Sequence, residues 1–127
     1  MNEAQLVTKI LGALNGVPET FAFKVVAAPY ARKGISDIIG CHRGSFFAFE
    51  VKLPGKEKTL TIPQENFLAA VLAVGGTAHT VTSVEQALTY LSAITAYERQ
   101  VSAILNALRY RPTPQTPECD RPIGPHD

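Results

Sequence analysis

Apolar residues near the start of the chain recur at the spacing of one face of an α-helix. The stripe comprises Leu6, Val7, Ile10, Leu11 and Leu14. Asn2 can cap the start of this helix and Gly16 follows its end, so the pattern predicts an amphipathic helix over residues 3–14. Glu3 falls on the same stripe, and we expect it to point toward the protein. From spacing alone, a first-turn acid favoured by the helix dipole is the simpler account of Glu3.

The next three apolar stretches have strand character. Residues 20–27 (TFAFKVVA) are aromatic and β-branched, and residues 34–40 and 46–52 form two further apolar runs. The polar segment His42-Arg43-Gly44-Ser45 separates those two runs and carries the Gly that a tight hairpin needs. The two runs are therefore predicted to pair as neighbouring strands. Residues 28–34 form a loop bounded by Pro and Gly.

A second helix is predicted after a loop over residues 53–60. Thr61 can serve as its N-cap, and Gln64 stands three residues later, which matches a capping box with Pro63 tolerated in the first turn. This helix should run to about residue 74 and be followed by a strand over residues 77–82. Ser83 then caps another helix. The order helix, three strands, helix, strand, helix predicts an α/β fold with one mixed sheet between helices.

The last helix carries a heptad seam that extends beyond the compact core. The seam comprises Ala87, Tyr90, Ile94, Tyr97, Val101, Ile104 and Leu108. We expect residues 1–93 to form the core domain and residues 94–110 a helical extension that supports self-association. Packing of the seam back onto the same domain is the alternative. Residues 111–127 are rich in Pro and predicted to form a flexible tail without chemistry.

Three charged residues lie inside the two hairpin strands. Asp37 is in the first strand, and Glu50 and Lys52 are in the second. Side chains alternate along a strand, so Glu50 and Lys52 share one face while Val51 points the other way. Asp37 can approach them from the neighbouring strand. Buried charges normally pair, coordinate a metal or line a cleft. Two carboxylates and a lysine at one place suit a divalent cation and a phosphate.

The pattern Asp37-x12-Glu50-x-Lys52 resembles the core of the PD-(D/E)XK nuclease superfamily. Gly34-Ile35-Ser36-Asp37 before it and Thr61-x-x-Gln64 after it narrow the resemblance to the VRR-NUC branch, which is similar to Holliday-junction resolvases. The similarity covers residues 3–93. The family motif has Pro where this chain has Ser36, a position that shapes the backbone and binds no metal. The resemblance implies a restriction-endonuclease-like αβββαβ core, and the extra C-terminal helix extends beyond what that core requires.

The resemblance also implies a site and a reaction. Asp37, Glu50 and the main-chain carbonyl of Val51 would hold Mg²⁺ or Mn²⁺, and Glu3 would reach the same ion or a second one. The catalytic group would comprise Asp37, Glu50, Lys52 and Gln64. Lys52 would stabilise developing charge or orient the attacking water, and Gln64 would position these groups. The expected activity is metal-dependent endonuclease cleavage of DNA, leaving 5′-phosphate and 3′-hydroxyl ends. A homodimer is expected because junction resolvases act as dimers.

The local charge balance supports a nucleic-acid substrate, although the formal net charge of the whole chain is only +1. Between residues 20 and 60, basic residues outnumber acidic ones, and two of the acids are the expected metal ligands. The residues expected to bind DNA are Arg32, Lys33, Arg43, Lys56, Lys58 and, by stacking on a base, Tyr30. A solvated basic surface is the alternative, and Tyr30 can equally pack its own loop.

Cys41 and Cys119 are far apart and form neither a metal-binding spacing nor a disulfide framework, which favours a reduced, intracellular protein. We find no secretory signal and no run that would cross a membrane. A small nuclease of this kind would fit a phage acting in a bacterial host. Three lone histidines, His42, His79 and His126, are read as ordinary residues rather than ligands.

Two other functions remain open at this stage. The chain could be a catalytically silent protein that binds branched or single-stranded DNA. It could also be a protein-interaction module in which the heptad helix is the working part and Glu50 and Lys52 form a surface ion pair. The preferred DNA structure is open as well: junctions, flaps, nicked duplex and plain duplex all fit the sequence.

Overall fold

The computed structural model describes residues 1–108, so the tail predicted over residues 111–127 lies outside the described part. Seven helices and strands follow one another in the predicted order. They are α1 (Glu3–Asn15), β1 (Thr20–Lys24), β2 (Ile38–His42), β3 (Ser45–Val51), α2 (Ile62–Ala73), β4 (Thr77–Val81) and α3 (Val84–Ala107).

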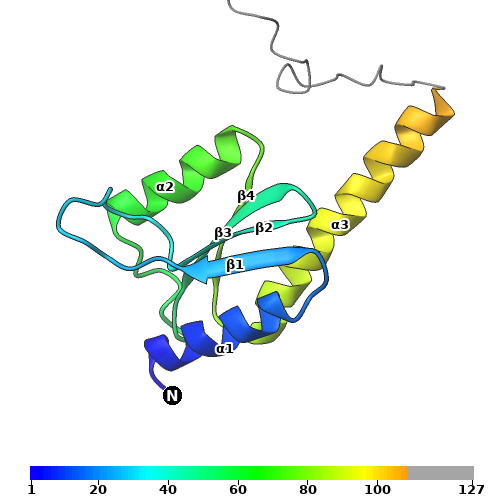
Figure 1. The fold of residues 1–127 in the computed structure, drawn as a ribbon. Helices are drawn as coiled ribbons and strands as arrows, with labels where there is room; N and C mark the ends of the chain where they lie inside the picture. Colours follow the sequence, from blue (N-terminus) through cyan, green and yellow to red (C-terminus); the bar gives the residue numbers. More distant parts are fainter. Residues whose placement is uncertain (109–127) are drawn as a thin grey trace, which may run out of the picture. The chain divides into compact units, whose positions relative to one another are not determined.

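The strands form one mixed sheet with the order β1-β2-β3-β4. The β1–β2 and β2–β3 pairs are antiparallel, and β3 pairs with β4 in parallel. Helix α2 lies on one face of the sheet, and α1 and the first turns of α3 lie on the other (Figure 1). The predicted α/β class, with a mixed sheet flanked by helices, is confirmed.

The hairpin is tighter than predicted. β2 begins at Ile38 instead of residue 34, and His42 pairs with Ser45, which leaves only Arg43 and Gly44 in the turn. Their φ values of 51° and 85° are those that a two-residue turn requires. β1 also ends earlier than predicted, at Lys24, which pairs with Ile38, the first residue of β2.

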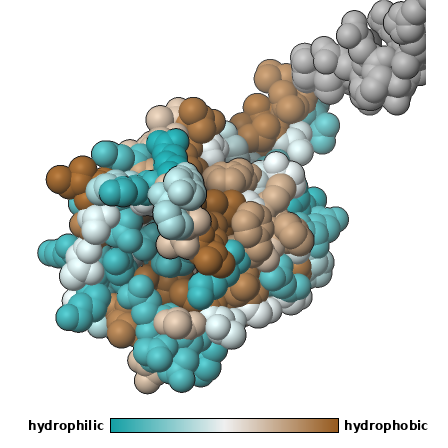
Figure 2. Space-filling model, turned by 60° about the vertical axis from the view of Figure 1, so that its left-hand side comes forward, coloured by the Kyte–Doolittle hydropathy of each residue, from teal (hydrophilic) through white to brown (hydrophobic). Residues whose placement is uncertain are grey.

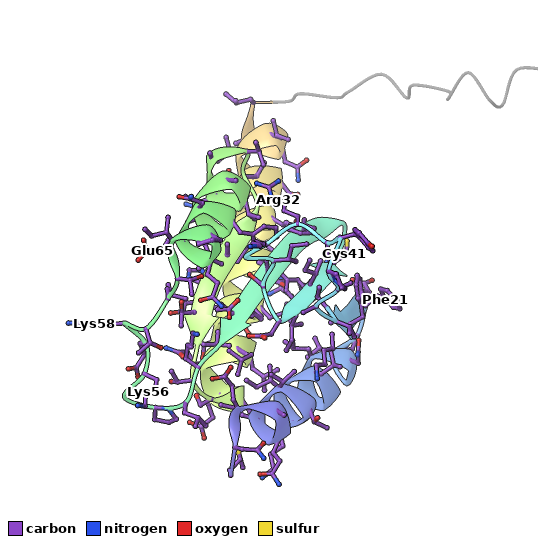
Figure 3. All side chains as sticks on the ribbon, turned by 90° about the vertical axis from the view of Figure 1, so that its left-hand side faces the viewer. Phe21, Arg32, Cys41, Lys56, Lys58 and Glu65 are labelled. Carbon is purple, nitrogen blue, oxygen red and sulfur yellow. The ribbon has the colours of Figure 1, made fainter. Side chains whose placement is uncertain are left out.

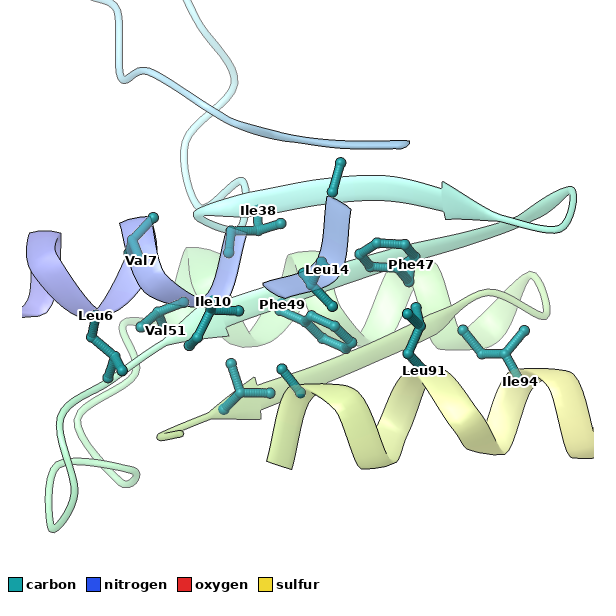
Figure 4. Packing of buried hydrophobic residues seen from close by; sticks show 13 residues of the cluster. Leu6, Val7, Ile10, Leu14, Ile38, Phe47, Phe49, Val51, Leu91 and Ile94 are labelled. Atoms are coloured by element: carbon teal, nitrogen blue, oxygen red, sulfur yellow. The ribbon is translucent and has the colours of Figure 1, made fainter. Parts of the chain in front are cut away.

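Most of the core lies between the sheet and the helices α1 and α3 (Figure 4). Phe47, Phe49 and Val51 alternate along β3 and are fully buried on this face. They pack against Ile10 and Leu14 of α1 and against residues of α3. A smaller cluster lies under α2 and comprises Ala48, Leu68, Val71 and Ala78. β3 therefore contributes to both clusters.

The side chain of His42 in β2 contacts side chains of β1 and α3. It is 4% exposed, its Nδ1 lies 2.7 Å from the hydroxyl of Thr20, and its Nε2 lies 2.6 Å from the hydroxyl of Thr95. The sequence placed this histidine in an exposed turn, whereas the structure places it on a buried strand position. Its role is structural, because both ring nitrogens are hydrogen-bonded.

The contacts divide the chain into a compact unit over Met1–Tyr97 and a second unit over Glu98–Asp127. α3 is one helix without a break. In the first unit, Ala87 and Ile94 of the heptad seam are buried in the core of their own domain. In the second unit, Ile104 and Leu108 of the seam are exposed. The first half of the seam thus packs back on its own domain, and self-association through the second half stays a prediction.

Among residues 1–108, no helix has the length and apolar character needed to cross a membrane.

A pair of phenylalanine substitutions tests the assignment of the core. Phe49→Ala should lower the free energy of unfolding by about 3–5 kcal/mol, because it removes a fully buried ring. Phe21→Ala should lower it by less than about 1 kcal/mol, because Phe21 is exposed and the substitution leaves no cavity. Denaturant titration measures both values. Equal losses for the two variants would contradict this description of the core.

Candidate active site

Asp37 and Glu50 lie side by side on the face of the sheet that carries α2. Ile38 pairs with Phe49, so the residue before Ile38 lies beside the residue after Phe49. Glu50 follows Phe49 and precedes Val51, and both of those residues are buried on the opposite face. The strand alternation predicted from the sequence is therefore present, and it brings the two carboxyl groups together.

Each carboxyl group has a defined hydrogen-bond partner. The backbone N–H of Val51 donates to Oδ2 of Asp37 at 2.8 Å, and the side-chain amide of Gln64 donates to Oε1 of Glu50 at 2.9 Å. Glu50 is only 2% exposed, and its second oxygen, Oε2, is buried without a hydrogen-bond donor. In the ionised form of Glu50 this buried oxygen would lack a partner, which is unfavourable, so the position calls for either a proton shared with Asp37 or a cation.

The pKa of Glu50 is raised to about 8. Burial is the largest cause, followed by the negative charge of Asp37 and by hydrogen bonding with the Asp37 carboxyl, which a proton on Glu50 allows. Lys52 lowers the pKa and Glu3 raises it, both through their charges. Without a cation, the pair therefore retains a proton at neutral pH. Strongly raised pKa values of this kind cluster at functional sites.

Gln64 serves both the helix and the site. Thr61 Oγ1 accepts from the backbone N–H of Gln64 at 3.3 Å, and Gln64 Oε1 accepts from the backbone N–H of Thr61 at 2.9 Å. This is the capping box predicted from the sequence. The amide nitrogen of the same side chain is left free to reach Glu50. The start of α2 thus abuts the acidic pair.

Gly34 fixes the position of that helix start. Its φ is 83°, and a Cβ built on it would lie 2.2 Å from the carbonyl oxygen of Pro63 and 2.8 Å from the backbone nitrogen of Gln64. Only glycine allows the backbones to approach so closely. The Gly34-Ile35-Ser36-Asp37 segment therefore presses against the first turn of α2 just before it enters β2.

A cleft of about 480 Å³ opens beside the acidic pair. Asp37, Glu50 and Gln64 line it together with Arg32 and Lys33 from the preceding loop. The remaining wall is formed by Val25, Val26, Ala27, Ala28, Ala31, Gly34, Ile35, Thr61 and Pro63. The site is therefore accessible, acidic at its floor, and basic and aliphatic around it.

Other residues predicted for DNA binding lie outside this cleft. Tyr30 is fully exposed on the same loop as Arg32. Lys56 and Lys58 project outward from the loop after β3 (Figure 3). Arg43 lies in the turn at the other end of the hairpin, where its Nε is 3.2 Å from Oε2 of Glu19. The structure therefore does not bring Arg43 together with the acidic pair.

Glu3 and Lys52 lie within electrostatic reach of Glu50, since their charges shift its pKa. Glu3 is exposed at the start of α1, although the sequence stripe predicted that it would point toward the protein. Lys52 is half-buried directly after β3. Ser36, which stands where the family motif has Pro, is fully buried, and its hydroxyl has no hydrogen-bond partner.

Residues 1–108 contain no ready-made group of three or more His, Cys, Asp or Glu side chains suited to a metal ion. The acidic pair of Asp37 and Glu50 is thus a two-carboxylate site. His79 lies elsewhere, stacked on Tyr90 at a ring separation of 3.7 Å, and burial lowers its pKa. His79 thus packs against α3 from its position in β4.

Comparison with protein-family models and with curated proteins finds no match for this chain. The functional assignment therefore depends on the residues and their geometry.

Sequence reasoning did not find two features of this region. The aliphatic wall contributed by Val25, Ala28 and Ile35 was not predicted, because a loop sequence does not reveal which way its apolar side chains point. The contact of Gly34 with α2 was also missed. A Gly directly before the motif was visible in the sequence, but its partner 29 positions later in the chain was not.

The raised pKa of Glu50 predicts a specific pH dependence of stability. Protonated Glu50 is favoured in the folded state, so its stabilising contribution is complete below pH 4.5 and is lost as the pH rises through about 8. Glu50→Gln removes this group, so in EDTA the variant should become progressively more stable than the wild type as the pH rises. Denaturant titrations at several pH values between 4.5 and about 8 measure the difference in the free energy of unfolding between the variant and the wild type.

Glu85→Gln is the matched control, because Glu85 is exposed in the first turn of α3. Its stability should follow the wild type across the pH range. A constant difference between Glu50→Gln and the wild type at all pH values would show that Glu50 has an ordinary pKa.

Substitution of Gly34 should disturb the start of α2. Gly34→Ala should lower the free energy of unfolding by about 1–3 kcal/mol more than Gly75→Ala. Gly75 also has a positive φ, 89°, but a Cβ there meets nothing within 4 Å, so it controls for backbone strain alone. The side-chain amide resonance of Gln64 should shift in Gly34→Ala only. Equal effects of the two substitutions would exclude the proposed contact.

Proposed function

We propose that this chain is a PD-(D/E)XK nuclease of the VRR-NUC branch, a metal-dependent endonuclease that hydrolyses phosphodiester bonds in DNA. The observation that carries the proposal is the buried, unpartnered Oε2 of Glu50 beside Asp37, at the floor of a cleft lined by Arg32 and Lys33. Surface ion pairs do not produce this arrangement. A divalent cation and a phosphate would satisfy it.

The residues present fit a hard divalent cation. Asp37 and Glu50 supply carboxylate oxygens, and a bound cation would offset the burial and the negative charge of Asp37 that raise the pKa of Glu50. The main-chain carbonyl of Val51 is the third proposed ligand, and Glu3 is close enough to act through its charge. Mg²⁺ keeps several waters and needs few protein ligands, so a two-carboxylate site is sufficient. When bound, Mg²⁺ or Mn²⁺ would polarise the phosphate and lower the pKa of a water.

The other side chains have separate proposed roles. Lys52 is half-buried near Glu50 and would stabilise charge developing on the phosphate or orient the attacking water. Gln64 is a positioning residue, because its side-chain amide donates to Oε1 of Glu50 and so restrains the carboxyl group. Arg32 and Lys33 would bind phosphates adjacent to the scissile bond.

Branched DNA, such as a Holliday junction or a flap, is the proposed substrate class, with a homodimer as the proposed assembly. The exposed apolar residues Ile104, Leu105 and Leu108 in the second half of α3 are available for self-association. A phage protein acting in the cytoplasm of a bacterial host is the proposed setting. Each of these proposals depends on the resemblance of the motifs.

Cleavage assays on junction, flap, nicked and plain duplex DNA test the proposal. The wild type should cleave at least one substrate in Mg²⁺ or Mn²⁺ and none in EDTA. Asp37→Asn and Lys52→Ala should each reduce the rate about 100-fold or more, because each removes a group that acts on the transition state.

Lys9→Ala and Glu85→Gln are the controls, since both residues are exposed on helices away from the cleft lining. Both should retain wild-type rates. Metal-independent binding without cleavage would favour the silent DNA-binding alternative. Cleavage that survives both Asp37→Asn and Lys52→Ala would falsify the assignment.

A further inference from the structure

One half of the sheet face that carries the acidic pair has no helix over it. α2 packs on β3 and β4, where Leu68 and Val71 cover Ala48 and Ala78. The half formed by β1 and β2 exposes its side chains instead. Phe21 is 69% exposed, Phe23 is 47% exposed, and Phe46 at the start of β3 is 43% exposed. We call Phe21, Phe23, Cys41 and Phe46 the open face.

The strand register places these residues beside one another. Phe21 pairs with Cys41, and Cys41 pairs with Phe46, so the three lie in one row across the sheet. Phe23 pairs with Ile39 in the next row. Phe21 and Cys41 are neighbours at the margin of the molecule in Figure 3. Figure 2 shows that hydrophobic residues reach the surface between hydrophilic ones on the face that it displays.

The same face leads directly to the proposed active site. Alternation along β3 puts Phe46 and Glu50 on one side of the sheet, roughly 13 Å apart along the strand. Asp37, directly before β2, is two residues before Ile39, the partner of Phe23. Phe23 is thus nearest the acidic pair and Phe21 lies one step farther away. A polymer with one phosphate in the cleft would continue over this face.

We propose that the open face is a stacking platform for unpaired bases of the nucleic acid whose phosphate enters the cleft. This inference rests on the proposed function and specifies a substrate with a single-stranded segment. Exposed aromatic rings stack on bases of any sequence. The rings of Phe21 and Phe23 are 6.0 Å apart and tilted by 45°, so each can take a base of an extended strand.

Charge favours a nucleic acid over a second copy of this chain as the occupant. The open face carries no charged residue, whereas the adjoining cleft carries Arg32 and Lys33. Bases stack on apolar surface, which the open face offers, and phosphates bind cations, which the cleft offers. A second copy seated on the open face would occupy the approach to the acidic pair.

Equilibrium binding in EDTA tests the platform without cleavage. The probes are a labelled single-stranded oligodeoxynucleotide of about twelve nucleotides and a duplex of the same sequence. Phe21→Ala combined with Phe23→Ala should weaken single-strand binding at least about tenfold and duplex binding less than about twofold. Phe21→Trp combined with Phe23→Trp should restore single-strand binding, because it restores stacking rings. Leu72→Ala combined with Val74→Ala, which alters exposed apolar residues elsewhere, should bind like the wild type.

Cys41 provides an independent footprint, because it is exposed within the open face. In a Cys119→Ser background Cys41 is the only cysteine. The single-stranded probe should slow its alkylation by N-ethylmaleimide, and the duplex should not. Unchanged alkylation in the presence of bound single strand would overturn the proposal. If alkylation slows as the protein concentration rises in the absence of DNA, the proposal is wrong and a second copy of the chain covers the open face.

The outcomes separate this inference from the proposed function. If the protein cleaves no DNA but bound single strand still protects Cys41 from alkylation, the nuclease proposal is wrong and the stacking platform stands. If cleavage depends on Asp37 and Lys52, the nuclease proposal stands. If the two Phe→Ala substitutions then weaken binding of single strand and duplex equally, the stacking platform is wrong.

Discussion

Placing the buried carboxyl group of Glu50 beside the half-buried carboxyl group of Asp37 is unfavourable, and this constraint governs the region around β2 and β3. Burial and the negative charge of Asp37 disfavour the ionised form of Glu50, so its pKa rises to about 8. Protein donors reach one oxygen of each group: a backbone N–H serves Oδ2 of Asp37 and a side-chain amide serves Oε1 of Glu50. The remaining buried oxygen has no donor. A protein that needed only stability would replace such a pair with apolar residues.

The surrounding structure holds this pair in place through backbone contacts. β3 is buried on its other face by Phe47, Phe49 and Val51, so Glu50 has little freedom to move away from Asp37. Gly34 brings the incoming loop against the first turn of α2, and the capping box orients Gln64 toward Glu50. Residues that look like ordinary turn and cap signals in the sequence therefore also determine the geometry of the acidic pair.

Much of this arrangement could be predicted from the sequence because it depends on short-range rules. Strand alternation predicted that Glu50 and Val51 point to opposite faces, and the hairpin predicted that Asp37 lies beside Glu50. The capping-box residues Thr61 and Gln64 predicted the start of α2. What could not be predicted depends on contacts between distant segments. The hydrogen bond between His42 and Thr95 requires knowledge of where α3 lies. The position of Arg43, in contrast, follows from the predicted hairpin, whose turn lies at the end away from Asp37.

The open face illustrates the same limit. The alternation of Phe21 and Phe23 identifies a strand, but only the position of α2 over β3 and β4 reveals that their face is uncovered. A sequence pattern reports which residues share a face, and tertiary packing decides whether that face becomes core or surface.

Proton release on binding of Mn²⁺ tests the central claim most directly. Glu50 should carry a proton at pH 7 in the free protein, because its pKa is about 8, and a cation must displace that proton to bind. Calorimetric titration in buffers of different ionisation enthalpy measures the number released. We predict close to one proton per bound ion at pH 7, with binding abolished in Glu50→Gln. Absence of Mn²⁺ binding, or binding without proton release, would contradict the account.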